Sequence, residues 1–121
     1  MTDYLLVFLG GGLGSMLRLG LSKYNTVSAT ILPLGTITAN ILSSLAFGAL
    51  IGWVSNRTNI PPSFRIFFGI GFCGGFSTFS TFSFETFYFL KTGQPIYAFL
   101  NVGLSLVGCL LGIYAGYSLT K

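Results

Sequence analysis

A run of hydroxyl groups inside an apolar stretch is the part of this chain whose residues could do chemistry. Residues 69–85 read GIGFCGGFSTFSTFSFE, a composition unsuited to a helix that faces lipid. Phenylalanine rings alternate with the hydroxyls, and one carboxylate, Glu85, follows them. The hydroxyl-bearing residues are Ser77, Thr78, Ser80, Thr81 and Ser83. Such donors can take the place of water around a small ion.

The rings and the carboxylate of this stretch each allow two interpretations. At about 100° per residue, Phe79 and Phe82 share one face of a helix, and Thr81 and Glu85 share an adjoining face. The rings are ordinary core if they only pack, but the positive edge of a ring can also attract an anion. Glu85 is the only acidic residue within the apolar segments, where a carboxylate is costly, so we expect it to be functional or hydrogen-bonded.

The elements that position these groups must lie in a membrane. Of the 121 residues, 52% are hydrophobic and 7% are charged, whereas soluble domains have about 25% charged residues. A helix that spans a bilayer needs about 20 apolar residues, so this length allows about four spans with short loops. We therefore predict an all-α membrane protein with a single four-span transmembrane domain over residues 1–121.

The basic residues and the cysteines exclude two other classes of protein. The six basic residues stand singly at the ends of the predicted spans, as interfacial anchors do, which argues against nucleic-acid binding. They are Arg18, Lys23, Arg57, Arg65, Lys91 and Lys121. Cys73 and Cys109 have neither metal-ligand spacing nor a CxxC arrangement, so we interpret both as small packing residues.

The third helix differs from the others because it is predicted to be broken. Helices are expected at residues 4–21, 34–54, from 64 onward and 96–119, with a turn-like segment at 23–33. The third is expected to break at Gly74 and Gly75 and to resume near Thr78. Irregular backbone at membrane depth is tolerated only inside protein or beside a cavity, and its carbonyls commonly hold ions. The alternative is a continuous helix that uses its glycines for packing.

Two polar stripes run along the second and fourth helices, because residues four apart share a helix face. The first comprises Asn40, Ser44, Gly48 and Gly52, and the second comprises Tyr97, Asn101, Ser105 and Cys109. The Asn40 amide either makes an interhelical hydrogen bond or is a donor that lines a pore. The second stripe is either hydrogen-bonding glue or a track for a solute.

The first helix carries glycines and one arginine. Gly10 and Gly14 suit close packing against another helix. Arg18 falls near the end of the span, where it is either an anchor that reaches the interface or a charge that draws anions towards a vestibule.

The charges do not favour one orientation in the membrane. Four spans put the loop at 55–63 and both termini on one side with three basic residues, and the opposite side collects the other three. Because this balance gives no positive-inside preference, the chain is expected to insert both ways and to pair as an antiparallel dimer.

Three segments carry a resemblance to a known family. They are GGGLGSMLR at residues 10–18, GTITAN at 35–40 and GFCGGFSTFSTFSFE at 71–85, within a matching four-span plan. The chain resembles the Fluc (CrcB) family of small fluoride channels. The resemblance implies a non-enzymatic channel in the bacterial inner membrane that passively exports fluoride and protects the cell. It also implies a dual-topology antiparallel homodimer with a structural Na⁺ at its centre.

The same resemblance assigns roles to individual residues. The backbone carbonyls of Gly74 and Ser77 would hold the Na⁺, and Arg18 would lie towards the vestibule. The fluoride pathway would comprise Asn40, Phe79, Ser80, Thr81, Phe82, Glu85, Tyr97, Asn101 and Ser105.

Two other functions fit the size of the chain. A small dual-topology proton-coupled multidrug exporter also has four spans, but it needs a carboxylate within its first helix, and here Asp3 precedes the first span. A membrane subunit that transports nothing would leave the broken helix and the two polar stripes unexplained.

Overall fold

The computed structural model describes residues 1–25 and 31–121, and this part of the chain is helical. The elements are α1 (Thr2–Asn25), α2 (Leu34–Ser55), α3 (Pro62–Arg65), the π-helix η1 (Ile66–Cys73), α4 (Gly74–Phe76), α5 (Phe79–Lys91) and α6 (Pro95–Thr120). Within the described residues, four helical segments are long and apolar enough to cross a membrane: Thr2–Lys23, Leu34–Ser55, Pro62–Lys91 and Pro95–Thr120. The predicted four-span helical architecture is confirmed. The start predicted for the first span is wrong, because α1 begins at Thr2 and includes Asp3 in its first turn. Of the turn predicted at 23–33, residues 26–30 lie outside the described residues, and residues 23–25 belong to α1 instead.

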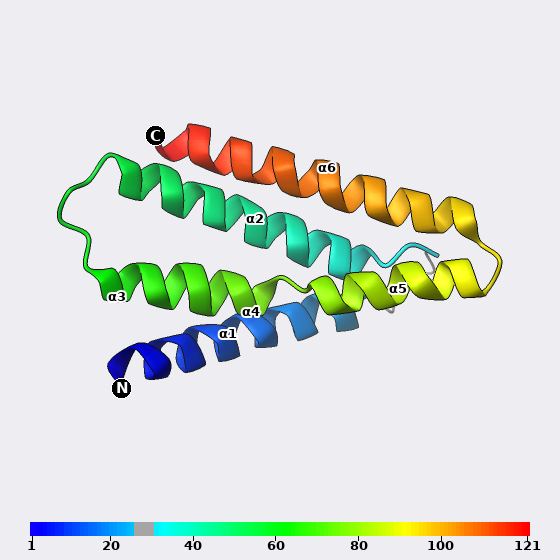
Figure 1. Cartoon of the computed structure of the whole chain (residues 1–121), viewed down its shortest axis with the longest axis horizontal. Coiled ribbons are helices and arrows are strands. Elements are labelled where there is room, and N and C mark those ends of the chain that lie inside the picture. Colours follow the sequence, from blue (N-terminus) through cyan, green and yellow to red (C-terminus); the bar gives the residue numbers. More distant parts are fainter. Residues whose placement is uncertain (26–30) are drawn as a thin grey trace.

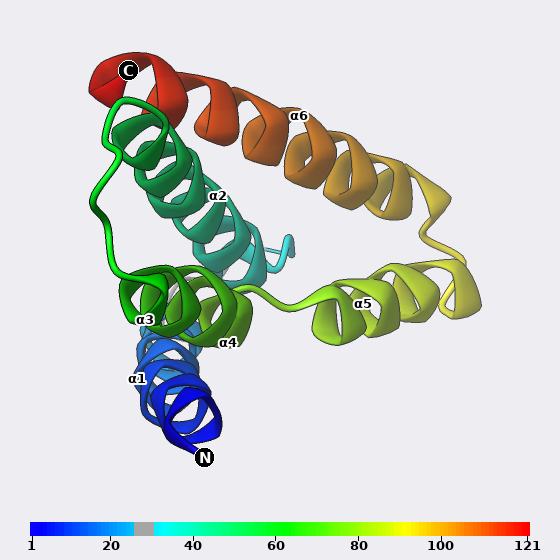
Figure 2. The ribbon, with the colours of Figure 1, turned by 60° about the vertical axis from the view of Figure 1, so that its left-hand side comes forward.

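Both termini and the loop between α2 and α3 lie at one end of the molecule, and the turn between α5 and α6 lies at the other (Figure 1). This is the arrangement of four successive crossings. Helices α2 and α6 run side by side, and α1 runs beneath the segment from α3 to α4 (Figures 1 and 2).

Local sequence explains several helix ends. Pro62 and Pro95 stand in the first turns of α3 and α6, where a missing N–H costs nothing. The Thr78 hydroxyl accepts a hydrogen bond from the N–H of Thr81, which caps α5. After α5, Gly93 adopts a φ of 73°, which favours glycine and turns the chain into α6.

Glycines allow the helices to approach backbone to backbone. An added Cβ at Gly71 of η1 would lie 3.1 Å from the Cα of Gly10 in α1. One at Gly112 of α6 would lie 3.1 Å from the carbonyl oxygen of Ile41 in α2. The close packing predicted for Gly10 and Gly14 of α1 is confirmed, and Gly112 allows a similar approach of α6 to α2.

The third crossing is irregular, but not where the glycines suggested. Gly74 is helical, with φ −64° and ψ −37°, and the extended residues are Ser77 (φ −78°, ψ 158°) and Thr78 (φ −150°, ψ 115°). The position predicted for the interruption, Gly74 and Gly75, is therefore wrong. Gly75 packs against the backbone of Gly11. This contact holds α4 in helical form alongside α1.

Candidate ion-binding site

Asn40 of α2 holds the extended segment between α4 and α5, called the junction below. Its Oδ1 accepts the N–H of Thr78 at 2.7 Å, and its Nδ2 donates to the Thr78 carbonyl at 3.2 Å. One amide thus satisfies both backbone groups of a residue that has left the helix. The interhelical hydrogen bond considered for Asn40 is present. Because Nδ2 carries a second hydrogen, the side chain can also donate to a bound group.

Two backbone carbonyls lose the partners that an uninterrupted helix would supply. Helical bonding would join the Gly74 carbonyl to the N–H of Thr78, which donates to Asn40 instead. It would join the Ser77 carbonyl to the N–H of Thr81, which donates to Thr78 Oγ1 at 3.2 Å. Side chains have therefore taken both donors, and these two carbonyls are available to a ligand.

The neighbouring carbonyls are satisfied by side chains from α1, α2 and the junction itself. The Cys73 carbonyl accepts hydrogen bonds from the hydroxyls of Ser43, at 2.7 Å, and Ser77, at 3.0 Å. The Gly75 carbonyl accepts from Arg18 Nε at 3.1 Å and from the Ser15 hydroxyl at 3.3 Å. Arg18 thus places its positive charge at the negative end of α4, a contact that neither interpretation of this residue foresaw.

A cavity of about 230 Å³ lies beside the junction. Its polar lining includes Asn40, Ser44 and Ser105, the last with a hydroxyl that is buried and without a hydrogen-bond partner among the described residues. The rings of Phe79 and Phe82 lie against it, with centroids 5.6 Å apart and planes inclined by 43°. The structure therefore brings together four of the predicted pathway residues, and it adds Cys109 to the lining.

A second polar group lies between α2, α5 and α6. The Thr36 hydroxyl donates to Glu85 Oε1 at 2.7 Å, which fulfils the expectation that Glu85 is hydrogen-bonded. Asn101 is fully buried and donates through Nδ2 to the Thr86 hydroxyl at 3.0 Å. Glu85 Oε2 and Asn101 Oδ1 are buried without partners in the described part of the chain. Unpaired buried oxygens are costly, so each needs an explanation.

The remaining predicted residues lie outside the 230 Å³ cavity. The hydroxyls of Ser80 and Thr81 lie 3.3 Å and 3.1 Å from Thr78 Oγ1, at the start of α5. The ring of Tyr97 packs against Phe89, with centroids 5.8 Å apart. The predicted set therefore divides between the cavity, the α5 cap and the polar group at Glu85 and Asn101.

Four contacting residues were missed from the sequence, one of which is Thr86, whose hydroxyl accepts from Asn101. Thr36 and Ser43 bond Glu85 and the Cys73 carbonyl, and Ser15 bonds the Gly75 carbonyl. Thr36, Asn40 and Ser43 are spaced at i, i+4 and i+7, which indicates one helix face. This spacing could have grouped Thr36 and Ser43 with Asn40.

The described residues contain no group of three or more His, Cys, Asp or Glu side chains that could hold a metal ion. A cation at this site would meet neutral oxygens, and the carbonyls of Gly74 and Ser77 are ligands of that kind.

Comparison with known proteins gives consistent matches over most of the chain. The family described as "CrcB-like protein, Camphor Resistance (CrcB)" matches residues 5–117. A "Fluoride-specific ion channel FluC" of Serratia proteamaculans is 42% identical over 92% of this chain and 87% of its own length. The proteins of the same name from Escherichia coli K12 and Pyrococcus horikoshii are 45% and 39% identical, over 86% and 96% of this chain and 82% and 94% of their own lengths.

Proposed function

The chain belongs to the CrcB family, and we propose that it is a fluoride channel, the activity for which its relatives are named. The observation that best supports this proposal is the cavity beside the junction. An amide donor, hydroxyls and two aromatic rings line it within a bundle whose four crossings suit a membrane.

These groups suit fluoride because the ion is small and strongly hydrated. Leaving water is costly unless donors replace the hydration shell. The Asn40 amide and the Ser105 hydroxyl can donate, and the edges of the Phe79 and Phe82 rings carry partial positive charge. None of these groups is a full positive charge, so the ion can also leave, as conduction requires.

We extend the pathway to the polar group at Glu85 and Asn101. Asn101 and Ser105 lie one turn apart on α6, and both are buried with one polar atom unpartnered among the described residues. Tyr97 continues this stripe, and Ser80 and Thr81 supply hydroxyls at the start of α5. Arg18 contributes a positive charge at the end of α4 towards a vestibule.

We further propose that two chains of opposite orientation form the working channel. Phe79 is 78% exposed in the single chain, although a ring that faces an ion needs walls on both sides. A second copy would supply the missing wall, and the balance of three basic residues on each side favours both orientations. The broken third helix would lie at the centre of this antiparallel homodimer.

At that centre we propose a structural Na⁺ held by the carbonyls of Gly74 and Ser77. The supporting observation is that side chains have taken the helical donors of both carbonyls. Two chains would give about four oxygen ligands without a carboxylate, which suits a monovalent ion. When bound, the cation would supply a fixed positive charge.

The proposed setting is the inner membrane of a bacterial cell, where export needs no energy source besides the membrane potential. Neutral HF enters and ionises at cytoplasmic pH. An inside-negative potential is worth about 2.3 kcal/mol per charge per 100 mV and drives the anion outward. This transport would protect the cell from fluoride.

Fluoride efflux from proteoliposomes loaded with KF, with a potassium ionophore and a fluoride electrode, tests the channel. We expect fast fluoride efflux and little chloride efflux under matched conditions. Equal chloride efflux, or no flux of either ion, would contradict the proposal. Efflux that requires an imposed proton gradient would favour the proton-coupled exporter.

A further inference from the structure

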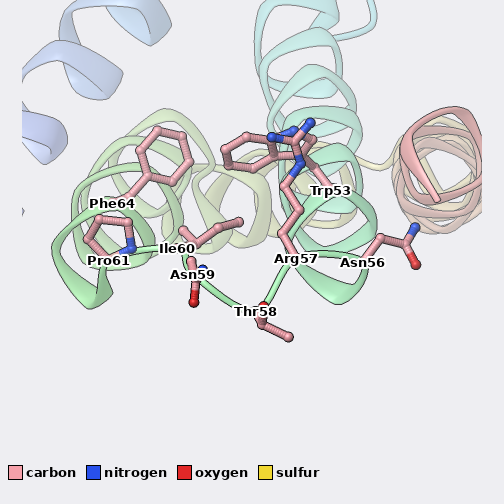
Figure 3. Close-up of a pocket in the computed structure, with 8 residues that line it drawn as sticks. All are labelled: Trp53, Asn56, Arg57, Thr58, Asn59, Ile60, Pro61 and Phe64. Carbon is pink, nitrogen blue, oxygen red and sulfur yellow. The ribbon is translucent and has the colours of Figure 1, made fainter.

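A second cavity, of about 420 Å³, lies at the end of the bundle where α2 passes into α3 (Figure 3). The last turn of α2, the loop at 56–61 and the first turn of α3 form its walls. It shares no lining residue with the cavity beside the junction. The proposed fluoride pathway therefore leaves this cavity unexplained.

A stacked arginine forms one wall of the cavity. The Cζ of Arg57 lies 4.7 Å from the centroid of the Trp53 ring. The Trp53 ring packs in turn against Phe64, with centroids 5.3 Å apart. Figure 3 shows the guanidinium over Trp53, with Ile60 and Phe64 beside the Trp53 ring. Stacking on an aromatic face holds a guanidinium in place while its N–H edge stays free to bind an anion in plane.

The cavity carries one charge, and that charge is positive. Among the described residues that line it, Arg57 is the single charged one, and none is a carboxylate. The chain has two acidic residues, and neither lines the cavity: Glu85 is hydrogen-bonded to Thr36, and Asp3 stands in the first turn of α1. The complementary ligand is an anion with apolar parts that fit against Ile60 and Phe64.

The level of the cavity in the membrane identifies the kind of anion. The apolar span Leu34–Ser55 ends just before the loop, so the cavity lies where lipid headgroups meet acyl chains. Tryptophan and arginine are enriched at that level, and basic pockets there bind acidic lipid headgroups. We propose that this cavity binds the phosphate of an acidic membrane phospholipid. Arg57 bonds the phosphate oxygens, and Trp53, Ile60 and Phe64 pack against the glycerol and the first acyl carbons.

Trp53 gives a direct measurement, because it is the only tryptophan of the chain. Its fluorescence is followed while the detergent-purified full-length protein is titrated with phosphatidylglycerol, phosphatidylcholine or inorganic phosphate. We expect saturable binding of phosphatidylglycerol only. The Arg57→Gln variant should bind it about tenfold more weakly, as expected for loss of a charge-assisted phosphate contact.

Arg65→Gln is the matched control, because Arg65 is an exposed arginine at the same end that does not line this cavity. Its affinity for phosphatidylglycerol should stay within about twofold of the parent value. Arg57→Lys should fall between the two, because lysine keeps the charge without the planar fork.

Three outcomes would overturn the proposal. An equal fluorescence change with phosphatidylcholine would mean that the site does not select lipids by the charge of their headgroup. Equal loss in the Arg57 and Arg65 variants would indicate diffuse surface charge. Displacement of the lipid by millimolar inorganic phosphate would indicate a site for free phosphate. None of these measurements uses fluoride flux, so they stand apart from the test of the channel.

Discussion

The side-chain amide of Asn40 bonds both backbone groups of Thr78, at 2.7 Å and 3.2 Å. This pairing lets the third crossing leave helical geometry at membrane depth, where an unpaired N–H or carbonyl is costly. It also diverts the N–H that would otherwise satisfy the Gly74 carbonyl. One side chain therefore stabilises the junction and exposes a backbone oxygen beside it.

Asn40→Ala should destabilise the protein and abolish most fluoride flux. It leaves the N–H and the carbonyl of Thr78 unpaired, at a cost of about 2–5 kcal/mol in total. Unfolding in detergent, followed by circular dichroism, and liposome efflux measure the two effects. Ser44→Ala is the control for stability, because Ser44 lines the same cavity while both backbone groups of Thr78 pair with Asn40. Equal stability of the two variants would contradict the role assigned to Asn40.

Phe79→Ile and Phe82→Ile should each lower fluoride flux by about tenfold, because isoleucine keeps apolar bulk but lacks the positive ring edge. Size-exclusion chromatography should show an unchanged assembly. Phe84→Ile is the control, because the Phe84 ring faces Tyr88 instead, with centroids 6.5 Å apart. If both test variants kept the parent flux, the rings would be packing residues only.

Thiol chemistry tests whether the 230 Å³ cavity is on the pathway. Methyl methanethiosulfonate transfers a thiomethyl group to a thiolate and releases a sulfinate, so modified Cys109 would narrow the cavity that it lines. Most of the flux should be lost, and Cys109→Ser should remove this sensitivity. Cys73 is buried, so Cys73→Ala should leave it unchanged. Full flux after modification of Cys109, confirmed by mass spectrometry, would place the pathway elsewhere.

The spans could be predicted from the sequence because apolar length alone decides them. The helices predicted at 34–54 and 96–119 are observed at Leu34–Ser55 and Pro95–Thr120. The close packing at Gly10 and Gly14 could be predicted from their spacing, since residues four apart share a helix face.

The junction was harder to locate because glycine has two uses. Low helix propensity favoured a break at Gly74 and Gly75, but Gly75 is needed for contact with Gly11. The interruption falls instead where Asn40 can pair with Thr78, a tertiary contact 38 positions apart in sequence. The partners of Arg18 and Glu85 escaped prediction similarly, because each lies on another helix.

The proposed antiparallel dimer predicts that the chain inserts in both orientations. A reporter on the C-terminus should be found on both sides of the membrane, because the charge balance predicted from the sequence assigns three basic residues to each side. Two or three lysines added to one end should bias the ratio towards that end in the cytoplasm. A single orientation of the unmodified chain would exclude a homodimer of this kind.

The proposed cation is bound by backbone oxygens of Gly74 and Ser77. Substitutions at these two residues should therefore have different effects on stability. The Ser77 hydroxyl donates to the Cys73 carbonyl, which also accepts from Ser43, so Ser77→Ala should change stability by no more than about 1 kcal/mol. Among the described residues, an added Cβ at Gly74 has no neighbour within 4 Å outside its own helical turn, so Gly74→Ala fits within one chain. Its loss of stability should therefore appear only in the dimer, where the added side chain would crowd the partner at the central site.

Replacing Na⁺ by a large organic cation, with time for slow exchange, should weaken the dimer and the fluoride flux together. The physical reason is that a fixed positive charge offsets the cost of bringing an anion into a low dielectric, and its loss leaves four carbonyl dipoles facing one another. Sedimentation in detergent measures the dimer independently of flux. Full dimer stability in preparations shown to be free of Na⁺ would count against the site, as would a loss of binding that depends on the Ser77 hydroxyl rather than on its carbonyl.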